Sequence, residues 1–317
     1  MCRERKDRGC TMSAGGGKKA IFAALSANAG IAVAKFVGAA ITGSGSMLAE
    51  AVHSVADTGN QGLLLLGQKR AEQEADELHP FGYGRNRYFY SFVVALVLFS
   101  LGSMYAIYEG IHKVQHGEEL SSPIVAIVIL LIAVALEGFS FVTAMRESSP
   151  LRQGASWWRF IRNSRSPELP VVLLEDTGAL IGLLIALVAV IMTSVTGNPV
   201  WDGIGTLCIG LLLGIIAVVL IVEMKSLLIG EGATPAEDEA IRTNLVDGRS
   251  IDRVIHLRTQ YLGPEEMLVA AKVAIVPGLD IATIATAIDE AEARVRVAVP
   301  AARVMYIEPD LYRTQPA

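Results

Sequence analysis

Long apolar runs alternate with short polar segments over roughly the first two thirds of the chain. A helix of roughly 20 apolar residues is long enough to cross the hydrocarbon core of a bilayer. The pattern predicts six such helices, at residues 20–42, 47–68, 88–111, 122–144, 170–195 and 201–225. The second and the fifth are interrupted by ionisable side chains, each of which costs about 3 kcal/mol at the centre of a membrane helix. Because such side chains are costly inside a membrane, we expect those of the second and fifth spans to have a function there.

The pattern changes after residue 226. GEGATPAEDEAIRTNLVDG is typical of a linker and a capped polar helix, and VIHLRTQYL and LVAAKVAIV then alternate in the manner of β-strands. A helical pattern over 281–297 and the strand-like ARVMYIEP complete the series. We therefore expect an α-helical membrane protein, with a six-transmembrane-helix bundle at 20–226 and a small cytoplasmic α+β domain (α-β-β-α-β) at 227–317.

Composition supports a membrane protein. Hydrophobic residues make up 52% of the 317 residues and charged residues 19%, and the mean hydropathy is +0.46, whereas an ordinary water-soluble domain is more highly charged. Membrane lipids are therefore expected partners. The net charge of -5 offers no basic face for nucleic acid. The three cysteines, Cys2, Cys10 and Cys208, form no CxxC pair and predict neither a disulfide framework nor a thiolate metal cluster.

Basic residues are distributed unequally among the loops. They gather in the tail at 1–19, in the loop after the second predicted span and in the loop after the fourth, whereas the opposite side has Lys113 alone. The positive-inside rule then places both termini and the α+β domain in the cytoplasm. The tail lacks the apolar run of a secretory signal. We expect a multi-pass integral protein of a bacterial inner membrane.

Two potential metal ligands lie four residues apart on the second predicted span. His53 and Asp57 therefore lie on one face of the helix, where an imidazole and a carboxylate can share one cation. A buried His–Asp pair without a ligand is the plainer alternative, but ionisable residues inside a membrane favour a functional interpretation. Glu50 lies one turn earlier and Asn60 one turn later, where supporting the ligands or lining an entry path suits them better than ligation.

The fifth predicted span offers a second set of acids. Glu175 and Asp176 are adjacent and therefore about 100° apart around the helix, so at most one can point directly at a given neighbour. Gly178 and Gly182 form a small-xxx-small face that predicts close packing, with the span of His53 as the expected neighbour.

Three further charges lie within or beside the predicted spans. Lys35 on the first span and Glu137 on the fourth could neutralise each other or contact water-filled vestibules, and we interpret them as packing or gating residues. Asp202 at the start of the sixth span is expected to cap its own helix.

Several motifs together resemble the cation diffusion facilitator family of metal/proton antiporters, over nearly the whole chain. They are SGSMLAEAVHSVADTGNQ, then HPFGYGR after the second span, the six-span order, and VIHLRTQYLG and YIEPD in the C-terminal domain. The stretch SRSPELPVVLLEDTGALIG is similar to the branch that contains the mitochondrial zinc exporter of animals, which shares the LLEDT sequence.

The resemblance implies a transport site made of one pair of side chains on the second span and one on the fifth, each spaced four residues apart. His53 and Asp57 match the first pair, but Val171 and Val172 occupy the slots where the second pair would have its histidine. The expected metal ligands are therefore His53, Asp57, Glu175 and Asp176. Asp176 is favoured as the direct ligand, with Glu175 as a further ligand or a proton acceptor.

The resemblance also implies sites outside the membrane. Asp76 and His79 match the family's metal positions in the loop after the second span, but Tyr83 replaces a second loop histidine, so a weak secondary site or an ordinary solvated loop is expected. In the C-terminal domain His256 remains, with Glu308 as a possible partner, and one His with one acid does not make a tetrahedral zinc site. We expect His256 to be structural and the domain to act in a homodimer.

The resemblance implies proton-coupled efflux of a divalent transition-metal cation by alternating access. Zn²⁺ is the first expectation, and a carboxylate-rich ligand set leaves Mn²⁺, Fe²⁺ and Co²⁺ as alternatives. Protons are the counter-substrate and no prosthetic group is expected. A metal sensor or assembly factor without transport is the alternative. An intramembrane enzyme is disfavoured because the sequence shows no nucleophile–base constellation.

Overall fold

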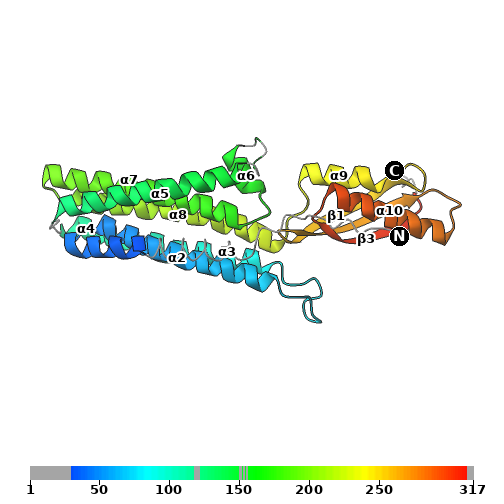
Figure 1. The fold of residues 1–317 in the computed structure, drawn as a ribbon, viewed down its shortest axis with the longest axis horizontal. Coiled ribbons are helices and arrows are strands. Elements are labelled where there is room, and N and C mark those ends of the chain that lie inside the picture. The colour runs from blue at the N-terminus through cyan, green and yellow to red at the C-terminus, as the bar shows by residue number, and fades with distance from the viewer. Residues whose placement is uncertain (1–29, 118–121, 150–151, 153, 155, 313–317) are drawn as a thin grey trace, which may run out of the picture. The chain divides into compact units, whose positions relative to one another are not determined.

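The computed structural model describes residues 30–117, 122–149, 152, 154 and 156–312 (Figure 1). The predicted tail at 1–19, with Cys2 and Cys10, lies outside the described residues. Two compact units can be distinguished, and each is described by itself. The first comprises Met1–Gln61, Leu101–Glu137 and Ala179–Leu212, and the second Gly62–Ser100, Gly138–Gly178 and Leu213–Ala317.

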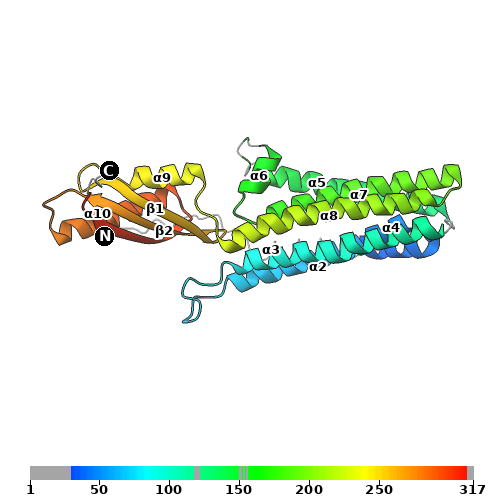
Figure 2. The ribbon, with the colours of Figure 1, turned by 180° about the vertical axis from the view of Figure 1, so that it is seen from behind.

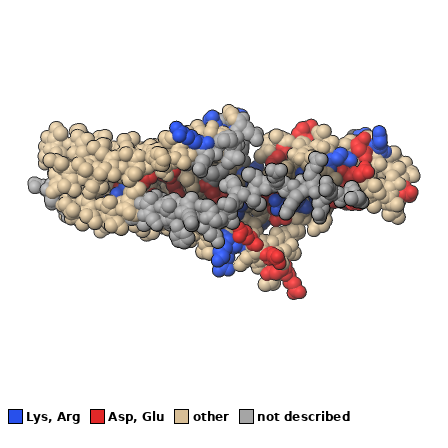
Figure 3. All heavy atoms as spheres, in the orientation of Figure 1, with Lys and Arg blue, Asp and Glu red and all other residues tan. Residues whose placement is uncertain are grey.

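Within the described residues, four stretches of helix are long and apolar enough to cross a membrane: Asn86–His116, Pro123–Thr143, Pro170–Thr196 and Val200–Ile229. They correspond to the third to sixth predicted spans, which are confirmed as apolar helices. The stretch Asn86–His116 is built from α3 (Asn86–Val97), the π-helical η1 (Leu98–Met104) and α4 (Tyr105–His116). The other three stretches belong to α5 (Pro123–Ser148), α7 (Glu168–Thr196) and α8 (Val200–Ile229). Figure 3 shows that charged side chains are sparse over these helices on the face in view.

The first two predicted spans differ from the other four. The second is helix α2 (Gly45–Ala71), whose 27 residues are long enough to cross a bilayer, but its ionisable residues keep it below the hydropathy of the four apolar spans. The described part of the first is the shorter apolar helix Gly30–Thr42. The helical membrane domain therefore has four apolar candidate spans, and the count of six stays a prediction.

A tight turn joins the first helix to α2. Gly43 adopts the left-handed conformation (φ 69°), and the ammonium of Lys113 on α4 donates a hydrogen bond to its carbonyl. Asp202 of α8 accepts hydrogen bonds from the backbone N–H groups of Gly45 (2.7 Å) and Ser46 (3.4 Å). A cation thus lies at the carboxyl end of one helix and an anion at the amino end of the next, as helix dipoles favour.

The expectation that Asp202 caps its own helix is therefore wrong. Asp202 lies inside the first turn of α8 and also accepts hydrogen bonds from the side chains of Ser44 (2.8 Å) and Ser46 (2.5 Å). The unpaired donors at the start of α2 recruit this carboxylate because the first turn of a helix has no intrahelical partners for its N–H groups.

The C-terminal region has the predicted order α-β-β-α-β. It consists of α9 (Pro235–Leu245), β1 (Ile251–Gly263), β2 (Glu266–Ile275), α10 (Ile281–Ala298) and β3 (Ala302–Asp310). The strand order is β1-β2-β3, with β1 antiparallel and β3 parallel to β2. Helices α9 and α10 cover one face of the sheet (Figure 2) and close a core of buried residues that includes Ile241, Val273 and Val295. The short helix α6 (Trp157–Asn163) precedes α7.

Candidate metal site

The structure places His53 and Asp57 together on α2. The distance from His53 Nδ1 to Asp57 Oδ1 is 3.5 Å, and the side chains are 0% and 17% exposed. Neither ring nitrogen of His53, nor Asp57 Oδ1, has a hydrogen-bond partner among the described residues. A buried polar atom left without a partner costs about 1–3 kcal/mol. A bound cation would supply the missing interactions, and imidazole and carboxylate are ligands for zinc.

A buried ionic network adjoins this pair. Lys35 is 1% exposed, and its ammonium lies 2.7 Å from Ser54 Oγ, 3.4 Å from Glu50 Oε2 and 3.9 Å from Glu137 Oε1. Sequence reasoning paired Lys35 with Glu137, and the structure adds two closer partners. Ser54 was missed, although its position four residues after Glu50 places it on the same face of α2.

Glu50 also marks a close approach of α2 to α7. A Cβ atom added to Gly182 would lie 2.3 Å from Glu50 Oε1, so a larger residue here would force this carboxylate to move. The expected packing of the Gly178–Gly182 face onto α2 therefore holds at Gly182. Gly178 faces α8 instead, where Ile216 Cδ1 would lie 2.7 Å from an added Cβ.

The two acids of the fifth predicted span are buried to different degrees. Glu175 is 6% exposed and Asp176 is half-buried, and both lie on α7 in the second compact unit. Glu175 precedes Gly182 by seven residues, about two helical turns, so both project from one face of the helix. Sequence reasoning favoured Asp176 as the direct ligand, whereas burial favours Glu175. Within the described residues, no group of three or more His, Cys, Asp or Glu side chains is close enough to hold an ion.

Asn60 continues the polar face of α2, as predicted. Its side chain is fully buried, two turns of helix after His53. Together with Glu50, His53 and Asp57 it forms a polar stripe along α2.

The loop after α2 is organised by hydrogen bonds around Asp76. The His79 backbone N–H donates to Asp76 Oδ1 (2.7 Å) and the Tyr83 hydroxyl donates to Oδ2 (2.7 Å), while His79 Nδ1 lies 3.3 Å from Oδ1. The hydrogen bonds from Tyr83 and from the His79 backbone hold the pKa of Asp76 below its ordinary value. Tyr83 thus occupies the carboxylate oxygen that a metal would need.

His256 and Glu308 lie on opposite edge strands of the sheet. Lys272 on the middle strand is the cross-strand neighbour of both, and its ammonium lies 3.0 Å from Glu308 Oε1 and 3.1 Å from an Asp310 oxygen. His256 is exposed and accepts a hydrogen bond from Arg258 (2.8 Å). A cation that already pairs with Glu308 separates the two side chains and disfavours metal binding there.

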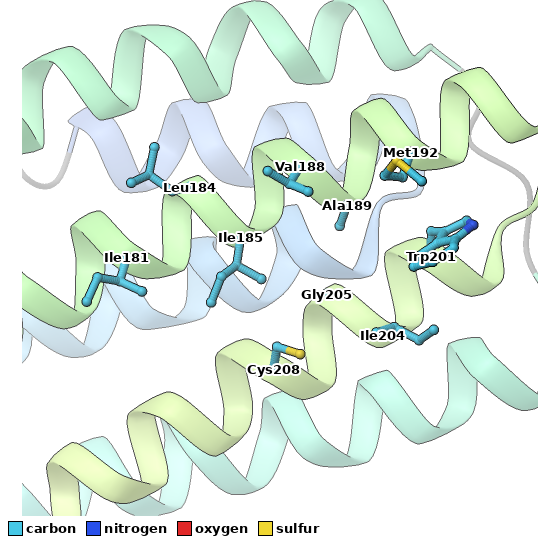
Figure 4. A pocket seen from close by; sticks show the side chains of 10 residues that line it. All are labelled: Ile181, Leu184, Ile185, Val188, Ala189, Met192, Trp201, Ile204, Gly205 and Cys208. Atoms are coloured by element: carbon cyan, nitrogen blue, oxygen red, sulfur yellow. The ribbon is translucent and has the colours of Figure 1, made fainter.

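A cavity of about 350 Å³ lies between α7 and α8 in the first compact unit (Figure 4). Its lining is almost wholly apolar and includes Met192, Trp201 and Cys208. Such a lining offers a divalent cation no oxygen or nitrogen ligand, so the polar stripe of α2 is the better candidate metal site.

Apolar helices of membrane-spanning length, ionisable side chains buried among them and a C-terminal α/β region define a multi-pass helical membrane protein. Residues 21–229 match the family model of the cation efflux transmembrane domain. The chain belongs to this cation efflux family, a family of transporters and not of enzymes.

Three relatives illustrate the range of the family. The chain is 35% identical over 240 residues to the mitochondrial proton-coupled zinc antiporter of Mus musculus. The aligned region is 75% of this chain and 42% of the relative. It is 30% identical over 220 residues to metal tolerance protein C4 of Arabidopsis thaliana, covering 69% and 48%. It is 27% identical over 207 residues to the magnetosome protein MamB of Magnetospira sp. (strain QH-2), covering 64% of each. The chain thus spans less than half the length of the first two relatives.

Proposed function

We propose that this protein exports a divalent transition-metal cation, Zn²⁺ first, in exchange for protons by alternating access. The observation that carries the proposal is the fully buried His53, whose two ring nitrogens have no hydrogen-bond partner among the described residues, one turn from Asp57. Imidazole and carboxylate bind a metal only when deprotonated, so protons compete with the metal for the same atoms. Histidine is the side chain that most readily gains and loses a proton near neutral pH, and we therefore propose His53 as the proton carrier.

We propose His53, Asp57 and Glu175 as ligands, with Asp176 as a further ligand or a proton acceptor. Helices α2 and α7 meet at Glu50 and Gly182. The hydrogen bond that the Gly45 N–H donates to Asp202 brings the start of α2 to the α7–α8 turn, which indicates antiparallel helices. Asp57 follows Glu50 by seven residues, as Glu175 precedes Gly182 by seven. Seven residues are about two turns, so Asp57 projects from the side of α2 that carries Glu50, and Glu175 from the side of α7 that carries Gly182.

Zinc is proposed first because a relative that is 35% identical is named a proton-coupled zinc antiporter. One imidazole with two or three carboxylates is also compatible with Mn²⁺, Fe²⁺ and Co²⁺, which accept harder oxygen ligands. We further propose six spans with both termini cytoplasmic, a homodimer, and residence in a bacterial inner membrane, where a proton gradient is available as driving force.

Metal-dependent proton flux in proteoliposomes tests the proposal. A pH-sensitive dye inside the vesicles should report proton movement on addition of Zn²⁺, with Mn²⁺, Fe²⁺ and Co²⁺ compared side by side. His53→Asn should abolish the flux, whereas His116→Asn, at the exposed end of α4, should retain it. Undiminished flux in His53→Asn would overturn the proposed site. Metal binding without flux in the unsubstituted protein would favour a sensor or assembly factor.

A further inference from the structure

Lys35 is the most unusual residue of the first compact unit, because a lysine ammonium is strongly hydrated and rarely buried without a role. It lies on the first helix, and its contacts come from two others: α2 supplies Glu50 and Ser54, and α5 supplies Glu137. The ammonium is closer to Ser54 Oγ (2.7 Å) than to either carboxylate (3.4 and 3.9 Å). The ammonium therefore lies between two carboxylates and forms a close ion pair with neither.

The carboxylate of Glu50 is held from both sides. Lys35 contacts its Oε2 atom, while Oε1 is buried against Gly182 and has no hydrogen-bond partner among the described residues. Glu50 precedes His53 by three residues and Asp57 by seven, so it lies on the same face of α2 as the proposed ligands. Its negative charge is therefore directed along the polar stripe toward the proposed metal site.

Lys35 offsets one of the three carboxylate charges in its immediate surroundings. The carboxylates of Glu50, Asp57 and Glu137 and the ammonium of Lys35 leave two negative charges when all four are ionised. Without Lys35 the same region has three. A third negative charge at low effective dielectric would hold a metal ion more tightly and would slow its release.

We propose that Lys35 is a positioning residue that acts as a tethered counter-ion: it orients Glu50 and offsets one carboxylate charge, and so limits metal affinity to a level that permits release. The inference rests on the proposed function. It assigns a role that a packing residue would not have, because removing a packing residue loosens the site, whereas removing a counter-ion tightens metal binding.

Zinc affinity of the full chain, measured by isothermal titration calorimetry in detergent, tests the inference. Lys35→Gln should tighten the dissociation constant by about tenfold or more, and Glu50→Gln should weaken it by a similar factor. The charge-balanced double variant Lys35→Gln with Glu50→Gln should return to within about threefold of the unsubstituted protein. Lys69→Gln, at the exposed end of α2, is the matched control and should change nothing.

Turnover supplies the second readout, since tighter binding by Lys35→Gln should be accompanied by slower zinc-driven proton flux. Equal or weaker zinc binding by Lys35→Gln would overturn the inference and leave the proposed function intact. If Lys35→Gln does not fold, Lys35→Arg and the double variant carry the test, and a double variant as weak as Glu50→Gln alone would also overturn it. Failure of the unsubstituted protein to bind zinc would overturn the proposed function and this inference together.

Discussion

At the scale of single residues, unpartnered buried atoms distinguish side chains that face a ligand from side chains that only pack. His53 and Glu50 are both fully buried, yet each has a nitrogen or oxygen atom without a hydrogen-bond partner in the described structure. Thr193 on α7 is also buried, but its hydroxyl donates to the Ala189 carbonyl (2.9 Å). Native proteins rarely leave buried polar atoms unpaired. The unpaired atoms of His53 and Glu50 are the observation on which the proposed metal site rests.

The two acids of α7 should respond differently to swaps that preserve charge. Glu175→Asp shortens the more buried side chain by one methylene and should weaken zinc binding by about tenfold, the effect of losing one well-placed ligand. Asp176→Glu should leave affinity within about threefold and mainly shift the pH dependence of flux. Isothermal titration calorimetry and flux at several pH values measure both. The reverse result would return the direct ligand to Asp176, the first expectation from sequence.

The loop after α2 should gain a metal site through one substitution. Tyr83→His removes the hydroxyl that donates to Asp76 and adds a second imidazole beside His79. We expect one additional zinc ion per chain by isothermal titration calorimetry. Tyr83→Phe is the control, because it releases Asp76 without adding a ligand, and it should bind no additional zinc. An unchanged stoichiometry in Tyr83→His would mean that the loop cannot gather three ligands.

Tyr83→Phe should also change the pKa of Asp76. The hydrogen bond from Tyr83 lowers that pKa in the folded loop, so the bond stabilises the loop above the ordinary pKa of an aspartate, and the effect is lost as the pH falls through the lowered value. Without the hydroxyl, the pKa of Asp76 should rise toward its ordinary value. NMR titration of the carboxylate measures the shift, and an unmoved pKa would show that the hydrogen bond is absent in solution.

Sequence reasoning succeeded at residues whose partners are local. The spacing of His53 and Asp57 was enough to place them on one face of α2, because helical periodicity determines such neighbours. It did not pair Lys35 with Ser54, and it predicted that the Gly178–Gly182 face packs on α2 without identifying Glu50 as the contact. Individual contacts between helices depend on the height at which the helices pack, and a single sequence carries no direct signal for that height.

At the scale of elements, α2 differs from the other helices in how clearly its sequence predicts a membrane span. Spans three to six are recognised by apolar length alone, whereas α2 falls short of that criterion because it contains polar and ionisable side chains. The start of α2 is held by Asp202, which follows Ser44 by 158 residues in the chain. A local capping pattern could not have predicted that partner.

Loss of the Asp202 charge should therefore destabilise the start of α2. Asp202→Asn keeps the size of the side chain but weakens four hydrogen bonds from Ser44, Gly45 and Ser46. We expect a loss of about 2 kcal/mol in stability, since charge-assisted bonds are worth more than neutral ones. Thermal unfolding in detergent measures the change. Asp252→Asn, an exposed acid on β1, is the control, and an equal effect of both substitutions would contradict the assigned role.

At the scale of the whole molecule, the homodimer stays a prediction. Helices α9 and α10 cover one face of the sheet, and the other face exposes Ile255 and Tyr306 with the ion pair between Lys272 and Glu308. Both outer strands also have one edge without a strand partner within the described residues. A domain this small buries little surface by itself. A second copy of the chain could cover the open face, in keeping with the symmetric association of most oligomers.

Removal of the C-terminal region should therefore weaken dimerisation. A chain that ends at residue 230 keeps the four apolar candidate spans and α2 but loses the sheet and its two helices. Sedimentation in detergent should show that its dimer dissociates at a protein concentration at least about tenfold higher than the dimer of the full chain. A chain that ends at residue 312, with the whole sheet intact, should match the full chain. Equal dimer affinities in all three chains would place the interface in the membrane helices. Loss of dimerisation in the 230-residue chain with retained zinc binding would show that the α/β region acts in assembly, apart from the metal site.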